Sequence, residues 1–247
     1  MKKSLKNLTG YSLEGNDGTK GKVKDFLFNE ETWTIRYMDS DITGVDHRKR
    51  VLIPRFFLGS PDWQEKQISV ALNKKEIESC PDLEEKSPVS RAYERELNKH
   101  YHIADYWPSM YTAPAGAGVF YPPRPIRVPT REVSEEKLDT SLRSCREVMG
   151  YFIKAGKDRF GQVEDLIMDD EDWQIVYLVI DTSRWKPWSK SVVISVDWLD
   201  TISFEHREVA VDMEMEQIKE APEYDPSHPI AMDYEKALHE YYESITN

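Results

Sequence analysis

The chain has 247 residues, enough for one large domain or two ordinary ones, and 39% of them are hydrophobic. Its formal net charge of -12 lies entirely in residues 141–247, and nucleic acid, which binds through phosphate neutralisation, would be repelled by that half. No apolar run approaches the roughly 18 residues of a membrane span, and two cysteines exclude a disulfide scaffold. We therefore expect a cytoplasmic protein without a membrane span, for which nucleic acid is an unlikely partner.

The residue pattern in the first part of the chain predicts several short strands separated by turns. Glycine, asparagine and aspartate favour positive φ and mark the turns, while Trp33, Ile35 and Tyr37 show the two-residue period of a half-buried strand. The expected strands cover residues 11–13, 22–28, 33–38, 51–57 and 68–72. So many short strands in so short a stretch favour a closed or nearly closed barrel, which hides its strand edges.

A helical period follows these strands. Residues 74–77 begin a short helix that Pro81 ends, and a longer helix is expected from 89 to 101. Apolar residues recur every fourth position along the longer helix, at Val89, Tyr93, Leu97 and Tyr101. This stripe either closes the barrel or presents part of a docking surface. Residues 1–105 are thus expected to form one barrel with C-terminal helices.

Residues 106–140 are rich in proline. Because proline lacks a donor N–H and fixes φ, this segment is predicted to be an extended linker without regular structure. Its aromatic side chains are unusual for a free coil, and residues of this kind often dominate binding at protein interfaces. The predicted partner-binding residues are Trp107, Tyr111, Phe120 and Tyr121.

Residues 141–247 repeat residues 1–105. The same residue types recur at a constant offset of 140, which becomes 141 after a single inserted residue. The repeat signature consists of the pairs Gly21 and Gly161, Asp25 and Asp165, Trp33 and Trp173, and Tyr37 and Tyr177. We therefore expect a tandem duplication whose second copy covers residues 141–247, with the copies packed about a pseudo-twofold axis as in homodimers.

The order of the motifs carries a family resemblance. The first copy has a Gly-Tyr strand, a Gly-x-Val-x-Asp strand, a Trp-x-Ile-x-Tyr strand, a Val-Leu-Ile-Pro strand and a Tyr-Glu-x-x-Leu helix. This order resembles the PRC-barrel family, which is named for the cytoplasmic domain of the photosynthetic reaction centre H subunit. The family also supplies the C-terminal domain of ribosome maturation factors of the RimM type. The resemblance implies a mainly β fold with short helices: two tandem small PRC-type barrels, each followed by one or two helices.

Residues with catalytic or metal-binding chemistry are few. The six histidines lack metal-ligand spacing, and Cys80 and Cys145, which the duplication does not repeat, are interpreted as buried apolar groups. Asp25 and Asp165 are interpreted as structural carboxylates that accept hydrogen bonds from nearby loop N–H groups. We therefore predict no catalytic residue, no cofactor and no metal site.

The leading hypothesis is a cytoplasmic, non-enzymatic protein-interaction module, an adaptor or an assembly factor, whose protein partner is unknown and which is a candidate homo-oligomer. The family resemblance implies two alternatives. One is a ribosome maturation or RNA-processing accessory that uses the basic cluster Arg48, Lys49 and Arg50. The other is an accessory that docks on a photosynthetic membrane electron-transfer complex. An enzyme acting on a small ligand between the barrels has no supporting group of residues.

Overall fold

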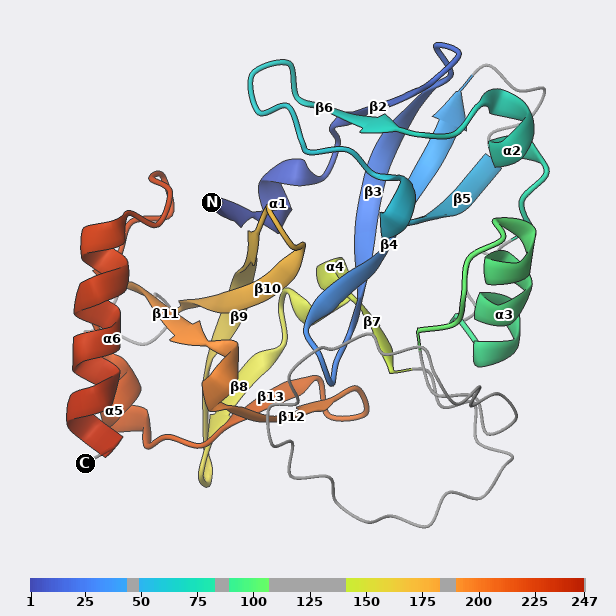
Figure 1. The fold of residues 1–247 in the computed structure, drawn as a ribbon. Helices are drawn as coiled ribbons and strands as arrows, with labels where there is room; N and C mark the ends of the chain where they lie inside the picture. Colours follow the sequence, from blue (N-terminus) through green and yellow to red (C-terminus); the bar gives the residue numbers. More distant parts are fainter. Residues whose placement is uncertain (44–48, 83–88, 107–140, 183–189, 247) are drawn as a thin grey trace, which may run out of the picture. The chain divides into compact units, whose positions relative to one another are not determined.

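The structure, a computed structural model, describes residues 1–43, 49–82, 89–106, 141–182 and 190–246 (Figure 1). The chain divides into two compact units. The first unit combines Met1–Glu85 with Ser141–Asn247, and the second is Lys86–Thr140. The strands of both repeats therefore belong to the first unit, whereas the helix α3 (Arg91–His100) belongs to the second.

The first repeat supplies short helices and strands to this unit. Its strands are β1 (Lys2–Ser4), β2 (Ser12–Gly15), β3 (Lys20–Asn29), β4 (Thr34–Thr43), β5 (Lys49–Pro54) and β6 (Gln67–Val70). Its helices are α1 (Leu5–Leu8), the 3-10 helix η1 (Arg55–Phe57) and α2 (Lys74–Glu78). The strand predicted over residues 51–57 was too long, because the chain turns into η1 directly after Pro54.

The second repeat has the equivalent elements and a few more. Its strands are β7 (Leu142–Ser144), β8 (Phe152–Ala155), β9 (Asp158–Asp169), β10 (Gln174–Asp181), β11 (Ser191–Ser195), β12 (Leu199–Ser203), β13 (Glu208–Val211) and β14 (Glu223–Tyr224). Its helices are α4 (Cys145–Val148), the 3-10 helix η2 (Val196–Trp198), α5 (Met215–Glu220) and α6 (Met232–Thr246).

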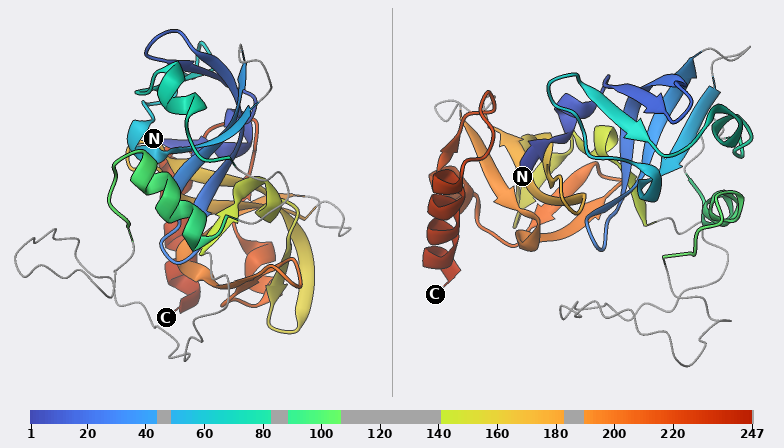
Figure 2. Two further views of the ribbon diagram at one scale, coloured as in Figure 1. Left: turned by 90° about the vertical axis from the view of Figure 1, so that its right-hand side faces the viewer. Right: turned by 45° about the horizontal axis from the view of Figure 1, so that its top comes forward.

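Both repeats use one strand order. In the first repeat the neighbours run β5-β4-β3-β2-β6, and β2 and β6 are parallel. In the second they run β11-β10-β9-β8-β13, with β8 and β13 parallel. Figures 1 and 2 show the two sets side by side. β4 and β10 join them, so the described strands form one mixed sheet that is not closed. The expectation of two closed or nearly closed barrels is therefore not confirmed. The prediction of a mainly β fold with short helices is confirmed.

The first strand of each repeat pairs with the other repeat (Figure 1). β1 runs antiparallel to β9, and β7 runs antiparallel to β3 in the equivalent register. Backbone hydrogen bonds extend both ladders, from Asp170 N to Met1 O (3.0 Å) and from Glu30 N to Ser141 O (2.8 Å). Each repeat thus completes the sheet of the other.

The first strands, β1 and β7, are thus exchanged between the repeats, and the short helices that follow them anchor this exchange. Leu5 and Leu8 of α1 are buried, and so are Cys145 and Val148 of α4. Ser4 and Ser144 begin the two helices, and their hydroxyls accept hydrogen bonds from the N–H groups of the third helical residues at 3.0 and 2.9 Å. Apolar side chains three residues apart lie on one face of a helical turn, so each helix buries that face against the sheet.

The signature tryptophans lie where the two repeats meet. Both Trp33 and Trp173 have positive φ, at 56° and 60°. Ile35 N donates to Trp173 O (2.9 Å), and Ile175 N donates to Trp33 O (2.8 Å). The ring of Trp173 also lies 5.9 Å from that of Phe26, between centroids. These reciprocal backbone hydrogen bonds place the two equivalent tryptophans at the junction of the repeats.

The signature glycines are required by close backbone approach. A Cβ on Gly21 would lie 2.7 Å from Asp41 O, and a Cβ on Gly161 would lie 2.8 Å from Ile180 Cγ2. Gly161 also has a positive φ of 53°, which favours glycine. A side chain at either position would push apart β3 and β4, or β9 and β10.

Candidate functional site

The predicted partner-binding aromatics cannot be placed in the fold. Trp107, Tyr111, Phe120 and Tyr121 all lie outside the described residues. In the second unit, the described part preceding them contains α3 and Tyr106, whose hydroxyl donates to Glu94 Oε2 at 2.9 Å. Glu94 also forms an ion pair with Arg91 at 3.4 Å.

The signature aspartates hold the exchanged segments in place. Ser144 Oγ donates to Asp25 Oδ2, and Arg146 N donates to Asp25 Oδ1 at 2.9 Å. The symmetric contacts are made by Ser4 Oγ and by Lys6 N, the latter at 3.0 Å from Asp165 Oδ1. Each carboxylate also accepts from the next N–H of its own strand, at 2.8 and 2.7 Å. Each aspartate therefore accepts hydrogen bonds from the N–H group of the next residue and from an N–H group of the opposite repeat.

The environment of these two carboxyl groups raises their pKa above the ordinary value of aspartate. Burial raises the pKa of Asp25 and of Asp165, although the hydrogen bonds from serine and backbone N–H groups act in the opposite direction. Cys145 lies near both aspartates, and burial together with their charges raises the pKa of its thiol. Cys80 and Cys145 are free and buried.

The aspartates predict a pH dependence of stability. Because their folded-state pKa is raised, their stabilising contribution is complete below the unfolded pKa of about 3.9 and is lost as pH rises through the folded pKa. We expect the wild type to gain stability relative to D25N/D165N as the pH falls from 7 to about 4. The measured quantity is the difference between their free energies of unfolding. Urea titrations at each pH measure this difference. A difference that is constant or falls on acidification contradicts the prediction.

A hollow of about 460 Å³ lies where the two repeats meet. Arg55, Phe56 and Leu58 line it from the first repeat, and Asp170, Glu171 and Trp173 line it from the second. Phe56 is 79% exposed, although its ring contacts Phe57 edge-on with centroids 5.2 Å apart. The hollow requires both copies, so it is a property of the duplicated chain and not of one repeat.

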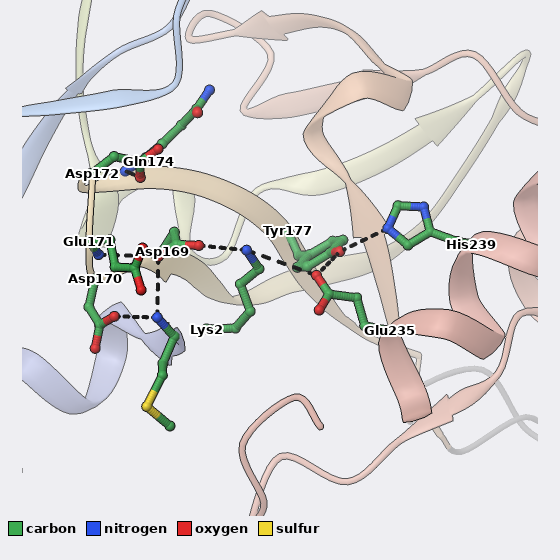
Figure 3. A network of polar contacts seen from close by, with 10 residues as sticks. Lys2, Asp169, Asp170, Glu171, Asp172, Gln174, Tyr177, Glu235 and His239 are labelled. Carbon is green, nitrogen blue, oxygen red and sulfur yellow. Dashed lines mark hydrogen bonds and ion pairs between the residues drawn. The ribbon is translucent and has the colours of Figure 1, made fainter. Parts of the chain in front are cut away.

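A polar network links β1 and β9 to α6 (Figure 3). Lys2 Nζ lies 2.6 Å from Asp169 Oδ2 and 3.9 Å from Glu235 Oε1. Tyr177 OH donates to Glu235 Oε1 at 2.8 Å and lies 3.5 Å from His239 Nε2. The exchanged strand β1 is therefore tied to α6 as well as to β9.

The charges in this network shift two pKa values. Burial acts to raise the pKa of Asp169, but the hydrogen bond and charge of Lys2, with hydrogen bonds from Glu171 N–H and the N-terminal ammonium, outweigh it and lower the pKa to about 2. Burial raises the pKa of Tyr177, and the adjacent Glu235 carboxylate raises it further. Asp169 therefore remains ionised and Tyr177 remains neutral at neutral pH.

The described members of the basic cluster make structural contacts. Lys49 Nζ donates to the carbonyls of Glu78 and Cys80 at 2.6 and 2.8 Å. Arg50 holds the buried carboxylate of Asp39 through its Nε at 3.0 Å and through its Nη2 at 2.7 Å. Arg48 lies outside the described residues. Replacing Lys49 or Arg50 would thus perturb the fold as well as any RNA contact.

Sequence reasoning missed the site formed by Phe56 and its neighbours. The available signal was the difference between the copies: the residue that corresponds to Phe56 at the offset of 141 is Asp197. A large apolar side chain at a position where the other copy has a carboxylate is not required by the fold.

The comparisons with known proteins identify no relative. No family model matches the chain, and no curated protein sequence matches it. Within the described part of the chain, no helix has the length and apolar character to cross a membrane. In the same residues, no three histidine, cysteine, aspartate or glutamate side chains are grouped so as to hold a metal ion.

Proposed function

We propose that the chain is a non-enzymatic protein-interaction module, an adaptor or an assembly factor, built from two tandem PRC-type barrel repeats. The main observation in support of this proposal is the exposed ring of Phe56 at the rim of the hollow between the repeats. Aromatic side chains beside a concavity are typical anchors of protein interfaces. The aromatics Trp107, Tyr111, Phe120 and Tyr121 are proposed as a second contact with the same partner.

The surroundings of Phe56 provide specificity for such a partner. Arg55 lines the hollow from the first repeat, while Asp170 and Glu171 line it from the second. Opposite charges beside an exposed aromatic ring orient a partner and exclude partners with the wrong charge pattern. Because both repeats supply these groups, the proposal also explains why two copies occur in one chain.

The substitution F56D tests the proposal without introducing a residue foreign to the fold, because the second copy has Asp197 at this position. We expect recovery of a stoichiometric protein partner from nuclease-treated native extract to fall at least about tenfold, as for loss of an interface anchor. The matched control is F204A, which removes another exposed ring, 61% accessible, from the second repeat.

A photo-crosslinker at position 56 makes the test direct. The proposal expects the same partner to be crosslinked from position 56 and not from position 204. Equal recovery with wild type, F56D and F204A overturns it, as does a bait that retains only RNA before nuclease treatment.

A further inference from the structure

The second repeat contains a groove of about 350 Å³ that the proposed function does not use. It lies between α6 and the elements β10, β11 and η2, with the start of the loop after β13 at its edge. Ser195, Leu238 and His239 line it together with two larger sets of side chains. The aromatic rings are Tyr177, Trp198 and Tyr242, and the carboxylates are Asp197, Asp212 and Glu243.

The aromatic rings are fixed by contacts at their polar ends. Tyr242 OH donates to Val193 O at 2.6 Å, and its ring packs against Trp198 with centroids 5.4 Å apart and an interplanar angle of 32°. Tyr177 OH donates to Glu235 Oε1 (Figure 3). These bonds fix the two tyrosine rings in the wall of the groove, where each tyrosine is 4% exposed and the half-buried Trp198 presents most of the accessible ring surface. Aromatic faces attract cations.

The carboxylates sit at the edges of the same groove. Asp197, the central residue of η2, and Asp212, which directly follows β13, are exposed, and Glu243 is exposed on α6. Asp212 N donates to Trp198 O at 3.0 Å, so the backbone beside one carboxylate is bound to the residue that supplies a ring. None of the described residues that line the groove is a lysine or an arginine.

Comparison of the two copies shows that the carboxylates are not required by the fold. At the equivalent positions, the first repeat keeps the aromatic rings as Tyr37, Phe57 and Tyr101. The three carboxylates, in contrast, correspond to Phe56, Ala71 and His102. The rings therefore belong to the repeated fold, whereas the negative charge is specific to the second copy.

We infer that this groove binds a small organic cation, an alkylammonium group held between aromatic rings and carboxylates. Rings attract the cation through their quadrupole, and the carboxylates attract it by charge. The volume suits a compact ligand, since small-molecule pockets begin near about 300 Å³. The same chemistry is available on a free metabolite or on a methylated lysine side chain. This inference is independent of the interaction proposed at Phe56.

Isothermal titration with choline and tetramethylammonium tests the inference, with the neutral choline isostere 3,3-dimethylbutan-1-ol as the matched ligand. We expect both cations to bind and the isostere to bind at least about tenfold more weakly. A trimethyllysine peptide is titrated alongside them and distinguishes a protein source from a free metabolite.

The variants copy the first repeat, so the fold has a precedent for each of them. W198F, D212A and E243H are each expected to weaken cation binding about three- to tenfold. The control E240Q changes an exposed carboxylate of α6 outside the groove, which pairs with Lys236 at 3.7 Å, and should leave binding unchanged.

Cation binding that the groove variants reduce and E240Q does not supports the site, whether the tighter ligand is choline or the peptide. The inference is overturned if the neutral isostere binds as well as choline, if E240Q weakens binding as much as the groove variants, or if none of the cations binds.

Discussion

When the chain is cleaved between its two repeats, the two pieces are expected to remain associated. Each half expressed alone is expected to show no cooperative unfolding transition. In the intact protein β9 pairs with β1 and β3 pairs with β7, so a single half lacks the strand that completes its sheet. The half would also expose the surface that buries Leu5 and Leu8, or Cys145 and Val148. Exposed edges and apolar surface favour aggregation over independent folding.

A protease site inserted within residues 106–140 provides the measurement. After cleavage, the two pieces should co-elute as a one-to-one complex and unfold in one transition, whereas separately expressed halves should be insoluble or unfolded by circular dichroism. The uncut protein is the control for the insertion. Two soluble, independently folded halves would contradict the reciprocal exchange.

The second large effect is expected at the aspartates that bind the exchanged segments. Asp25→Ala leaves the N–H groups of Phe26 and Arg146 and the hydroxyl of Ser144 without this acceptor. Loss of several hydrogen bonds to one buried carboxylate should lower the free energy of unfolding by about 3 kcal/mol. This corresponds to a fall in Tm of about 6–12 °C for a unit of this size.

The symmetric change D165A should cost a similar amount, because the same contacts recur in the other repeat. Chemical denaturation measures both. The matched control is D62A, which removes an exposed carboxylate that accepts two turn N–H groups at 2.9 Å; it should cost about 1 kcal/mol or less. If D25A and D165A are no more destabilising than D62A, the two aspartates do not hold the exchanged segments in place.

The duplication, the strand pattern and the structural importance of the signature residues were accessible from the sequence, because hydrophobic periodicity and a fixed offset survive in each copy. The exchange of β1 and β7 between the repeats was not accessible from the sequence. Ser4 and Ser144 are equivalent, and so are Asp25 and Asp165, so the sequence is equally compatible with a serine that bonds within its own repeat or across to the other one. Only the three-dimensional path of the chain distinguishes the two arrangements.

The groove and the hollow depend on a different kind of signal. Their informative residues are those at which the copies disagree, such as Phe56 against Asp197 and Ala71 against Asp212. A search for repeats emphasises agreement, and each disagreement alone is an ordinary surface substitution. The packing of α6 beside η2 brings the separate differences together in one groove.

The exchange also determines when the protein can finish folding during synthesis. Ser4 and Asp165 are 161 residues apart in the chain, yet they form a direct hydrogen bond. As translation proceeds from the N-terminus, Leu5 and Leu8 leave the ribosome long before the strand that buries them has been made. Pairing between such distant segments is slow and leaves apolar surface exposed. We therefore expect the first copy to remain incompletely folded until the second emerges.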